Sequence, residues 1–250
     1  MDGMPRLSHL QLSLAFAFFV TMASAQTIPS QPDSSTITAT EADRDVPLTT
    51  DPSASFWQQT RPVFITGDTF GNPVPSHRTE VRSRWTKDSL YLLFISPYEQ
   101  LNLKPSPQTA TETNQLWNWD VAEAFIGSDF KNIRQYKEFE MSPQGEWVDL
   151  DIDLAKQGDK DAWKWNSGIK VSARIDRDRK IWYGAMRIPF ASLGASSVAS
   201  GTTFRINLFR CQGPTEGRHY LSWQPSMSKS FHVPEHFGTL VLASAKHPSR

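Results

Sequence analysis

The chain is poor in the residues that carry covalent, metal or nucleic-acid chemistry. It has 250 residues but a single cysteine, Cys211, which excludes an intramolecular disulfide and a cysteine metal cluster. Lys and Arg number 26 and Asp and Glu 26, so the formal net charge is zero. Nucleic-acid-binding proteins normally carry a basic surplus. We therefore expect no nucleic-acid partner, and we interpret Cys211 as a small buried hydrophobic residue.

Long hydrophobic runs are also missing, except near the N-terminus. Residues 10–22 form an apolar run that follows Arg6 and His9 and precedes Ala23-Ser24-Ala25. The run is shorter than the roughly 20 residues that a membrane span needs. An apolar run before an Ala-x-Ala site is typical of a secretion signal. The sequence therefore predicts a signal peptide over residues 1–25, a secreted or periplasmic protein, and no membrane association after cleavage.

Composition divides the rest of the chain. Residues 26–55 are rich in Ser, Thr, Pro, Asp and Ala without a sustained apolar period, which predicts a flexible lead-in. Residues 56–243 contain all nine tryptophans and are predicted to form one domain. Residues 244–250 are predicted to be a polar tail. Within the domain, residues 56–70 are expected to form a first strand or a cover over the core.

Short strand-like segments separated by turns fill the predicted domain. Along residues 203–211, Phe204, Ile206 and Leu208 are expected on one face and Asn207 and Phe209 on the other. Repeated short strands with turns between them predict an all-β fold, an antiparallel β-sandwich of jelly-roll or immunoglobulin-like type. The predicted strands are residues 79–85, 90–96, 121–126, 136–141, 147–152, 169–175, 181–188, 203–211, 220–223 and 237–242.

Residues 116–153 combine tryptophans with carboxylates inside strand patterns. A pyranose ring has an apolar face that a tryptophan can cover, and rim hydroxyls that carboxylates, amides and arginine can bind. Asp149, Asp151 and Asp153 alternate and should share one strand face. Crowded carboxylates are either solvated or share a cation such as calcium, and both alternatives stay open. Leu154 and Lys160 replace the glycine and glutamate of an EF-hand, which is excluded.

Six sequence pieces occur in the order found in the family 9 carbohydrate-binding modules. They are LYLLFIS, WDVAEAFIG, YKEFEMSPQGEWVD, WYGAMRIPF, FRINLFRC, and YLSWQPS with FHVPEHFGTLVL. The chain thus resembles this family, and most closely its stand-alone bacterial members, over about residues 56–242. The resemblance implies a β-sandwich related to DOMON-type domains. It also implies non-catalytic binding of mono- or oligosaccharides, often by secreted proteins acting on plant polysaccharides of the xylan or cellulose type.

The resemblance also implies a set of site residues. Trp117 followed by Glu123 is similar to the family's pairing of a stacking tryptophan with a binding carboxylate. Arg210 stands where the family has a second stacking tryptophan, and Phe209 and Trp223 are the candidates to replace it. The predicted carbohydrate-binding residues are Trp117, Trp119, Glu123, Arg134, Tyr136, Glu138, Asn207, Phe209, Arg210 and Trp223.

Two other functions stay open alongside carbohydrate binding. Glu123 and Glu138 could serve as the acid and base of a glycoside hydrolase. No G-x-S-x-G motif occurs, which argues against serine-type hydrolysis. A haem-binding DOMON-like domain would need an axial Met and His. The candidate pairs are Met227 with His232 and Met141 with His219. We expect a binding protein that requires no cofactor, with calcium as the open alternative.

Overall fold

The computed structural model describes residues 35–156 and 162–245, so the predicted signal peptide lies outside the described residues. The described part is nearly all β-structure, with thirteen strands and one four-residue α-helix, α1 (Ser55–Gln58). It contains no helix with the length and apolar character needed to cross a membrane. The remaining helical turns are of the 3₁₀ type: η1 (Pro75–His77), η2 (Leu116–Asn118), η3 (Leu154–Lys156), η4 (Phe190–Leu193) and η5 (Pro234–His236).

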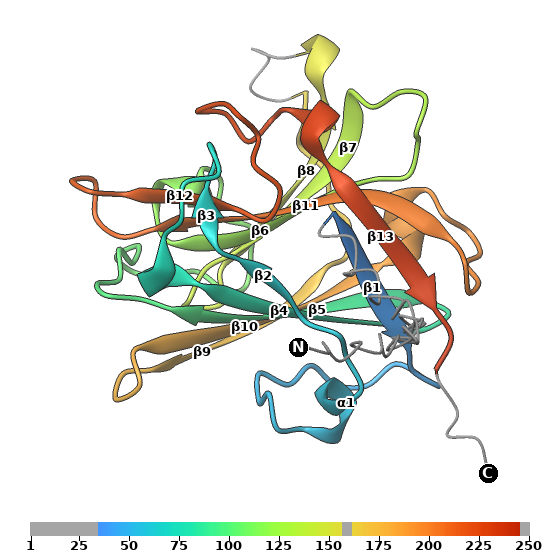
Figure 1. Ribbon diagram of the computed structural model, residues 1–250, viewed down its shortest axis with the longest axis horizontal. Coiled ribbons are helices and arrows are strands. Elements are labelled where there is room, and N and C mark those ends of the chain that lie inside the picture. Colours follow the sequence, from blue (N-terminus) through green and yellow to red (C-terminus); the bar gives the residue numbers. More distant parts are fainter. Residues whose placement is uncertain (1–34, 157–161, 246–250) are drawn as a thin grey trace, which may run out of the picture. The chain divides into compact units, whose positions relative to one another are not determined.

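The strands form one hydrogen-bonded sheet (Figure 1). Its main path runs β8-β7-β6-β11-β13-β1-β4-β5-β10-β9, and β2, β3 and β12 pair beside this path. The predicted all-β class is thus confirmed, whereas the jelly-roll or immunoglobulin-like arrangement stays a prediction. The strands are β1 (Thr36–Glu41), β2 (Val63–Ile65), β3 (Gly67–Asp68), β4 (Thr79–Trp85), β5 (Ser89–Pro97), β6 (Val121–Gly127), β7 (Gln135–Met141), β8 (Trp147–Asp153), β9 (Lys170–Asp176), β10 (Ile181–Pro189), β11 (Thr203–Gln212), β12 (His219–Ser222) and β13 (Gly238–Ala243).

Strand β1 corrects two expectations. It lies between β13 and β4 and runs parallel to both, although the other pairs of the sheet are antiparallel (Figure 1). The predicted flexible lead-in is therefore wrong for Thr36–Glu41, and the sheet is not purely antiparallel. Ile37 and Ala39 are fully buried, which is the alternation of a strand. The Ser, Thr and Pro content of the lead-in hid this short strand, even though threonine favours strands.

The segment after β1 is also packed onto the sheet. The Val46 amide donates to the Tyr91 hydroxyl at 3.1 Å, and the indole N–H of Trp57 donates to the Thr49 carbonyl at 3.0 Å. Trp57, which belongs to α1, is buried against Tyr91 and Leu93. Residues 56–70 thus provide both alternatives predicted for them, since α1 covers the sheet and β2 pairs with β4.

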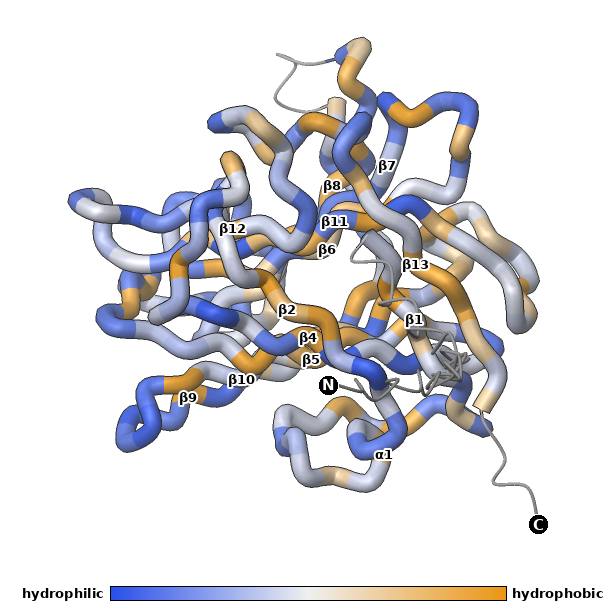
Figure 2. Tube along the Cα trace, viewed as in Figure 1, coloured by the Kyte–Doolittle hydropathy of each residue, from blue (hydrophilic) through white to orange (hydrophobic). Residues whose placement is uncertain are grey.

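The main core is built from one face of the central strands. Leu92 and Phe94 of β5 pack in the same cluster as Ile206 and Leu208 of β11. This confirms the alternation expected along residues 203–211 and leaves the second face of β11, with Phe209, outside that core. In Figure 2, hydrophobic residues follow these strands, whereas the hairpin between β9 and β10 is hydrophilic. All ten predicted strands are present, and no boundary differs from its predicted position by more than one residue.

Replacing Gly238 by Ala should destabilise the protein by about 2 kcal/mol, because an added methyl overpacks the junction of β1 and β13. Its Cβ would lie 2.7 Å from Trp223 Cη2 and would collide with the Ser35 carbonyl, which is backbone. Urea unfolding monitored by tryptophan fluorescence measures the change. The control is Lys170→Ala at an exposed position of the edge strand β9. An unfolding midpoint of Gly238→Ala equal to that of the wild type would contradict the packing described for β1.

Candidate functional site

A cavity of about 410 Å³ lies on the face of β6, β7 and β11 that is turned away from the main core. Its wall residues come from the turn before β6, the strands themselves and the loops on either side of β12. Aromatic lining residues are Trp117, Phe125, Trp163, Tyr220 and Phe231. Charged lining residues are Glu123, Glu138, Arg218, Lys229 and His232. The cavity therefore combines apolar faces with carboxyls, as expected for a polar ligand that has an apolar side.

Strand alternation places three carboxyls beside the cavity. Along β6, Ala122 and Ala124 enter the core, so Glu123 points to the opposite face. On β7, Glu140 is the register partner of Glu123, and Glu138 is two residues away on the same face. All three are buried, with 1%, 4% and 0% exposure for Glu123, Glu138 and Glu140. Three neighbouring buried carboxyls cannot all carry charge without a large cost.

Few donors stabilise these carboxyls. Glu123 Oε1 accepts a weak hydrogen bond from Cys211 Sγ at 3.5 Å. Among the described residues, no N–H or hydroxyl donor reaches Oε2 of Glu138 or either oxygen of Glu140. His232 Nε2 lies 4.0 Å from Glu138 Oε2, which is an ion pair only if the imidazole is protonated.

The electrostatics follow from this burial. Loss of water raises the pKa of Glu123 well above its usual value, and the charge of Glu138 raises it further. Burial likewise raises the pKa of Glu140, with added repulsion from Glu123 and Glu138. The pKa of Glu138 is also raised by burial, against the opposing effect of His232. Burial raises the Cys211 pKa as well, so the thiol stays protonated, as its interpretation as a buried hydrophobic residue requires.

The turn before β6 presents Trp117 at the cavity. Gln115 adopts a left-handed conformation with φ of 60°, and η2 then buries Leu116 completely. Trp117 is left 38% exposed and lines the cavity. The sequence predicted both Trp117 and Trp119 as carbohydrate-binding residues. Because the segment is a 3₁₀ turn, Trp119 does not line the cavity, and only Trp117 does.

Arg218 fixes this turn to the loop after β11. Its guanidinium donates to the carbonyls of Trp117 and Trp119 at 3.0 and 2.5 Å, and to that of Gly213 at 2.7 Å. It also lies 3.7 Å from the buried carboxylate of Asp120. Arg218 therefore holds two loops together by direct hydrogen bonds, and its charge is balanced by Asp120.

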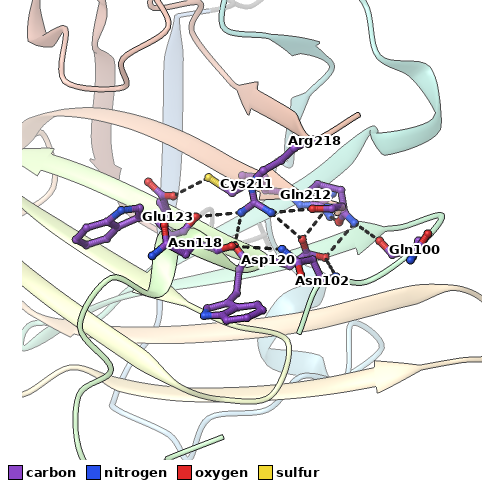
Figure 3. A network of polar contacts seen from close by, with 12 residues as sticks. Gln100, Asn102, Asn118, Asp120, Glu123, Cys211, Gln212 and Arg218 are labelled. Atoms are coloured by element: carbon purple, nitrogen blue, oxygen red, sulfur yellow. Dashed lines mark hydrogen bonds and ion pairs between the residues drawn. The ribbon is translucent and has the colours of Figure 1, made fainter. Parts of the chain in front are cut away.

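Asp120 is the centre of the network in Figure 3. It is fully buried, and its carboxylate accepts hydrogen bonds from the Gly213 amide at 2.7 Å and the Asn102 amide at 3.1 Å. The Gln212 side-chain amide donates to it at 3.0 Å. These bonds fix the backbone next to the turn that carries Trp117, so the turn is in position before any ligand arrives.

The far wall of the cavity rests on a second aromatic cluster. Phe231 stacks on Phe209 with ring centroids 4.3 Å apart, and Phe209 is fully buried. The Tyr136 hydroxyl lies 2.7 Å from His232 Nδ1, and the ring of Trp163 lies 5.6 Å from that imidazole. The predicted site residues Phe209 and Tyr136 thus support cavity-lining residues and do not line the cavity themselves.

Arg210 lies on the opposite face of β11 from Phe209. It is fully buried, donates to Thr79 Oγ1 at 2.7 Å and to the Pro97 carbonyl at 3.2 Å, and sits over the Trp182 ring. Strand alternation explains this placement, since residues one apart face opposite sides. The structure therefore does not bring Arg210 to the cavity, and Arg210 is a buried structural residue on the core side.

Three further predicted residues lie away from the cavity. The Asn207 side chain bridges to the backbone of Gln224 through bonds of 2.9 and 3.0 Å. Trp223 is 9% exposed and packs in the main core. Arg134 is exposed and donates to the Leu154 carbonyl at 3.4 Å. Of the predicted set, the structure brings Trp117, Glu123 and Glu138 together in one cavity.

The alternating aspartates of β8 do not converge. Asp149 accepts hydrogen bonds from the amide and hydroxyl of Ser167, and Asp151 pairs with Lys137 at 2.5 Å. Asp153 accepts from the Ala155 amide. Within residues 35–156 and 162–245, no group of three or more His, Cys, Asp or Glu side chains could hold a metal ion. Calcium binding stays a prediction that this geometry does not support.

The methionines and histidines considered for haem are engaged elsewhere. Met141 packs in the main core against Gly184. The His219 ring lies 4.6 Å from that of His77, whereas His232 bonds to Tyr136. Met227 is 58% exposed. These placements leave the haem alternative without a supporting observation.

Several cavity residues were not anticipated from the sequence. Phe125 could have been found, because it lies two residues after Glu123 on one strand and so shares its face. Arg218, Phe231 and His232 lie in loops around β12, where no periodic pattern marks a facing side. Trp163 also lies in a loop, after β8, and carries no local signal that places it beside Glu138.

Comparison with known proteins shows that this fold is similar to that of family 9 carbohydrate-binding modules. The family described as carbohydrate-binding family 9 matches residues 155–242, which include the loops carrying Arg218 and His232. A Bacteroides uniformis protein, provisionally described as carbohydrate-binding, superposes with a TM-score of 0.64 at 16% identity, over 83% of this chain and 98% of that one. A family 9 module of Caldicellulosiruptor kristjanssonii, solved with cellotriose, superposes with a TM-score of 0.60 at 11% identity, over 86% and 99%.

The chain is also similar in sequence to two mammalian proteins. The chain is 28% identical over 123 residues to the UPF0462 protein C4orf33 of Homo sapiens, across 49% of this chain and 51% of the human protein. It is 28% identical over 154 residues to the Mus musculus homolog, across 57% and 69%. The chain thus spans about half the length of the human relative. The likeness to family 9 carbohydrate-binding modules that the sequence predicted is confirmed by the family match and the shared fold.

Glu140→Gln should stabilise the protein at neutral pH by on the order of 1 kcal/mol, because it removes a buried carboxyl that resists ionisation. The raised folded-state pKa means that stability is highest below the usual value of 4.5 and is lost as pH rises toward the folded-state pKa. The gain in the variant should therefore shrink below about pH 4.5. Urea unfolding at neutral pH and below about pH 4.5 measures this gain in stability. The control is Glu216→Gln at an exposed loop position, and an equal gain at both pH values would contradict the account.

Proposed function

We propose that the cavity between Trp117 and His232 binds a carbohydrate without catalysing its reaction. The observation that carries this proposal is the meeting of Trp117, exposed on a turn held by hydrogen bonds, with the buried carboxyls Glu123 and Glu138, of which Glu138 Oε2 receives no hydrogen bond from the described residues. A pyranose ring can contact both the indole and the carboxyls. Its C–H face covers an indole, and its rim hydroxyls donate to carboxyl oxygens.

The dimensions and rigidity of the cavity suit a small ring ligand. A volume of about 410 Å³ lies within the range of small-molecule sites. Tyr220, 47% exposed, adds a second aromatic residue beside the Trp117 turn. It takes the place that the sequence reasoning assigned to Phe209 or Trp223. A ring held between aromatic side chains and hydrogen-bonded at its rim needs little rearrangement of the protein, because Arg218 and Asp120 already fix the turn.

The ionisation of the carboxyls favours binding over hydrolysis. A glycoside hydrolase needs one protonated acid and one ionised carboxylate on either side of the bond. Burial raises the pKa of both Glu123 and Glu138, so the cavity does not hold a clearly ionised partner among these two. Hydrogen bonding to sugar hydroxyls requires no such division of roles.

The biological setting of this binding is part of the proposal. The apolar run before Ala23-Ser24-Ala25 supports a secreted or periplasmic protein. The module of C. kristjanssonii has been solved with cellotriose and with glucose, which supports glucose-containing plant polysaccharides as ligands. A secreted module of this kind would keep a catabolic enzyme or the cell near its polysaccharide.

Trp117→Ala should weaken binding of cellotriose about tenfold or more, which is about 1.4 kcal/mol, because the stacking face is lost. Isothermal titration calorimetry measures the affinity. The matched control is Trp119→Ala, which removes an indole from the same turn at a position that does not line the cavity. The site assignment fails if the two variants lose the same affinity, and the function fails if the wild type binds no sugar at millimolar concentration.

A further inference from the structure

The cavity floor contains acceptors that no part of the described protein satisfies. Glu138 lines the cavity, is 4% exposed, and its Oε2 receives no hydrogen bond. Neither oxygen of Glu140, directly beside it, is reached by an N–H or hydroxyl donor. A buried acceptor without a donor costs free energy, which a ligand with several donors at one point can recover. A single hydroxyl brings one donor, whereas an ammonium group brings three.

The positive groups around the cavity do not neutralise this floor. Arg218 is engaged by Asp120 and by three backbone carbonyls, two next to the Trp117 turn and one in the loop after β11. Lys229 is exposed, so its charge is screened by solvent. His232 approaches Glu138 to 4.0 Å, and its other ring nitrogen bonds to Tyr136. Among the residues that the structure describes, the buried floor therefore has three carboxyls and no fixed buried cation.

The aromatic walls of the cavity suit an organic cation. Trp117, Phe125, Trp163, Tyr220 and Phe231 line the same cavity as Glu123 and Glu138. Aromatic faces attract organic cations through their quadrupole, most strongly where water is excluded. A metal ion is not favoured, since no group of three suitable ligands forms among the described residues. Carboxyls together with aromatic rings match an ammonium group carried by an organic ring.

We propose that the preferred ligand of this cavity is a sugar that carries a free ammonium group, such as a glucosamine unit, rather than a neutral glucose-type sugar. The inference rests on the proposed carbohydrate function and specifies its ligand class. The pyranose ring lies on Trp117 while the ammonium group donates to Glu138 and its neighbours. Acetylation of the amine removes both the charge and two of the three donors, so an N-acetyl sugar loses the advantage.

Binding of an ammonium sugar should be linked to proton release. The cation favours the ionised form of the carboxyls, so a proton held by the cluster leaves as the ligand enters. The titratable and charged groups around the bound ammonium come from every element that surrounds the cavity. They are Glu123 on β6, Tyr136, Glu138 and Glu140 on β7, Cys211 on β11, and Arg218, Lys229 and His232 in the loops on either side of β12.

Calorimetric titrations of the full chain with glucosamine, glucose and N-acetylglucosamine test this proposal. At about pH 6 the amine is protonated. We expect glucosamine to bind about tenfold more tightly than either neutral sugar. Repeating the titration in buffers of different ionisation enthalpy should show proton release for glucosamine alone. Glu138→Gln should reduce the ratio of glucosamine to glucose affinity toward one. Asp178→Asn, at an exposed position of the hairpin between β9 and β10 that does not line the cavity, should leave the ratio unchanged.

The outcomes separate the two proposals. Equal or weaker binding of glucosamine than of glucose overturns the ammonium preference and leaves carbohydrate binding intact. Tighter binding of glucosamine without proton release also overturns it, because the carboxyl cluster is then not the group that recognises the amine. Heat from none of the three sugars overturns both. The wild-type comparison decides these cases even if Glu138→Gln does not fold.

Discussion

The two-residue alternation of β6, β7 and β11 is the constraint on which both the core and the cavity depend. On one face these strands place Ala124, Phe139 and Leu208 in the main core. On the other they place Glu123, Glu138 and Phe209, which form or support the cavity. A shift of register by one residue would exchange the two faces and put carboxyls into the core. The stability of the sheet and the chemistry of the site are therefore set by the same pairing.

The second requirement is that loops on this face stay fixed. Arg218 and Asp120 do this by joining the Trp117 turn to the loop after β11 (Figure 3). On the opposite side, Tyr136 and Phe209 hold the segment with Phe231 and His232. A ligand that enters between these supports meets side chains already in position, so little of its binding free energy is lost in ordering the protein.

Strands were predictable where apolar periodicity was strong, because alternation reports burial directly. Trp117 and Glu123 were singled out by the family likeness. The register of β6 and β7 that brings Glu138 beside Glu123 is a tertiary feature that the sequence did not report. Strand alternation also puts Arg210 on the face of β11 opposite to Phe209. Arg210 was nevertheless predicted as a site residue, because it stands where the family has a stacking tryptophan. Strand β1 was not predicted, because the Ser, Thr and Pro content of the lead-in obscured the alternation of its six residues. The loop residues Arg218 and His232 could not be placed, since tertiary contacts alone bring them to the cavity.

The central claim is the location of the sugar, and mapping the ligand on the protein tests it most directly. Amide and indole N–H shifts recorded by NMR during a titration with cellotriose report which residues the ligand reaches. The account predicts that the largest changes occur at the Trp117 indole, Tyr220 and His232, around the cavity of β6, β7 and β11. Changes concentrated instead at Trp165 and Asn166, which line a separate groove beside β8, would contradict it.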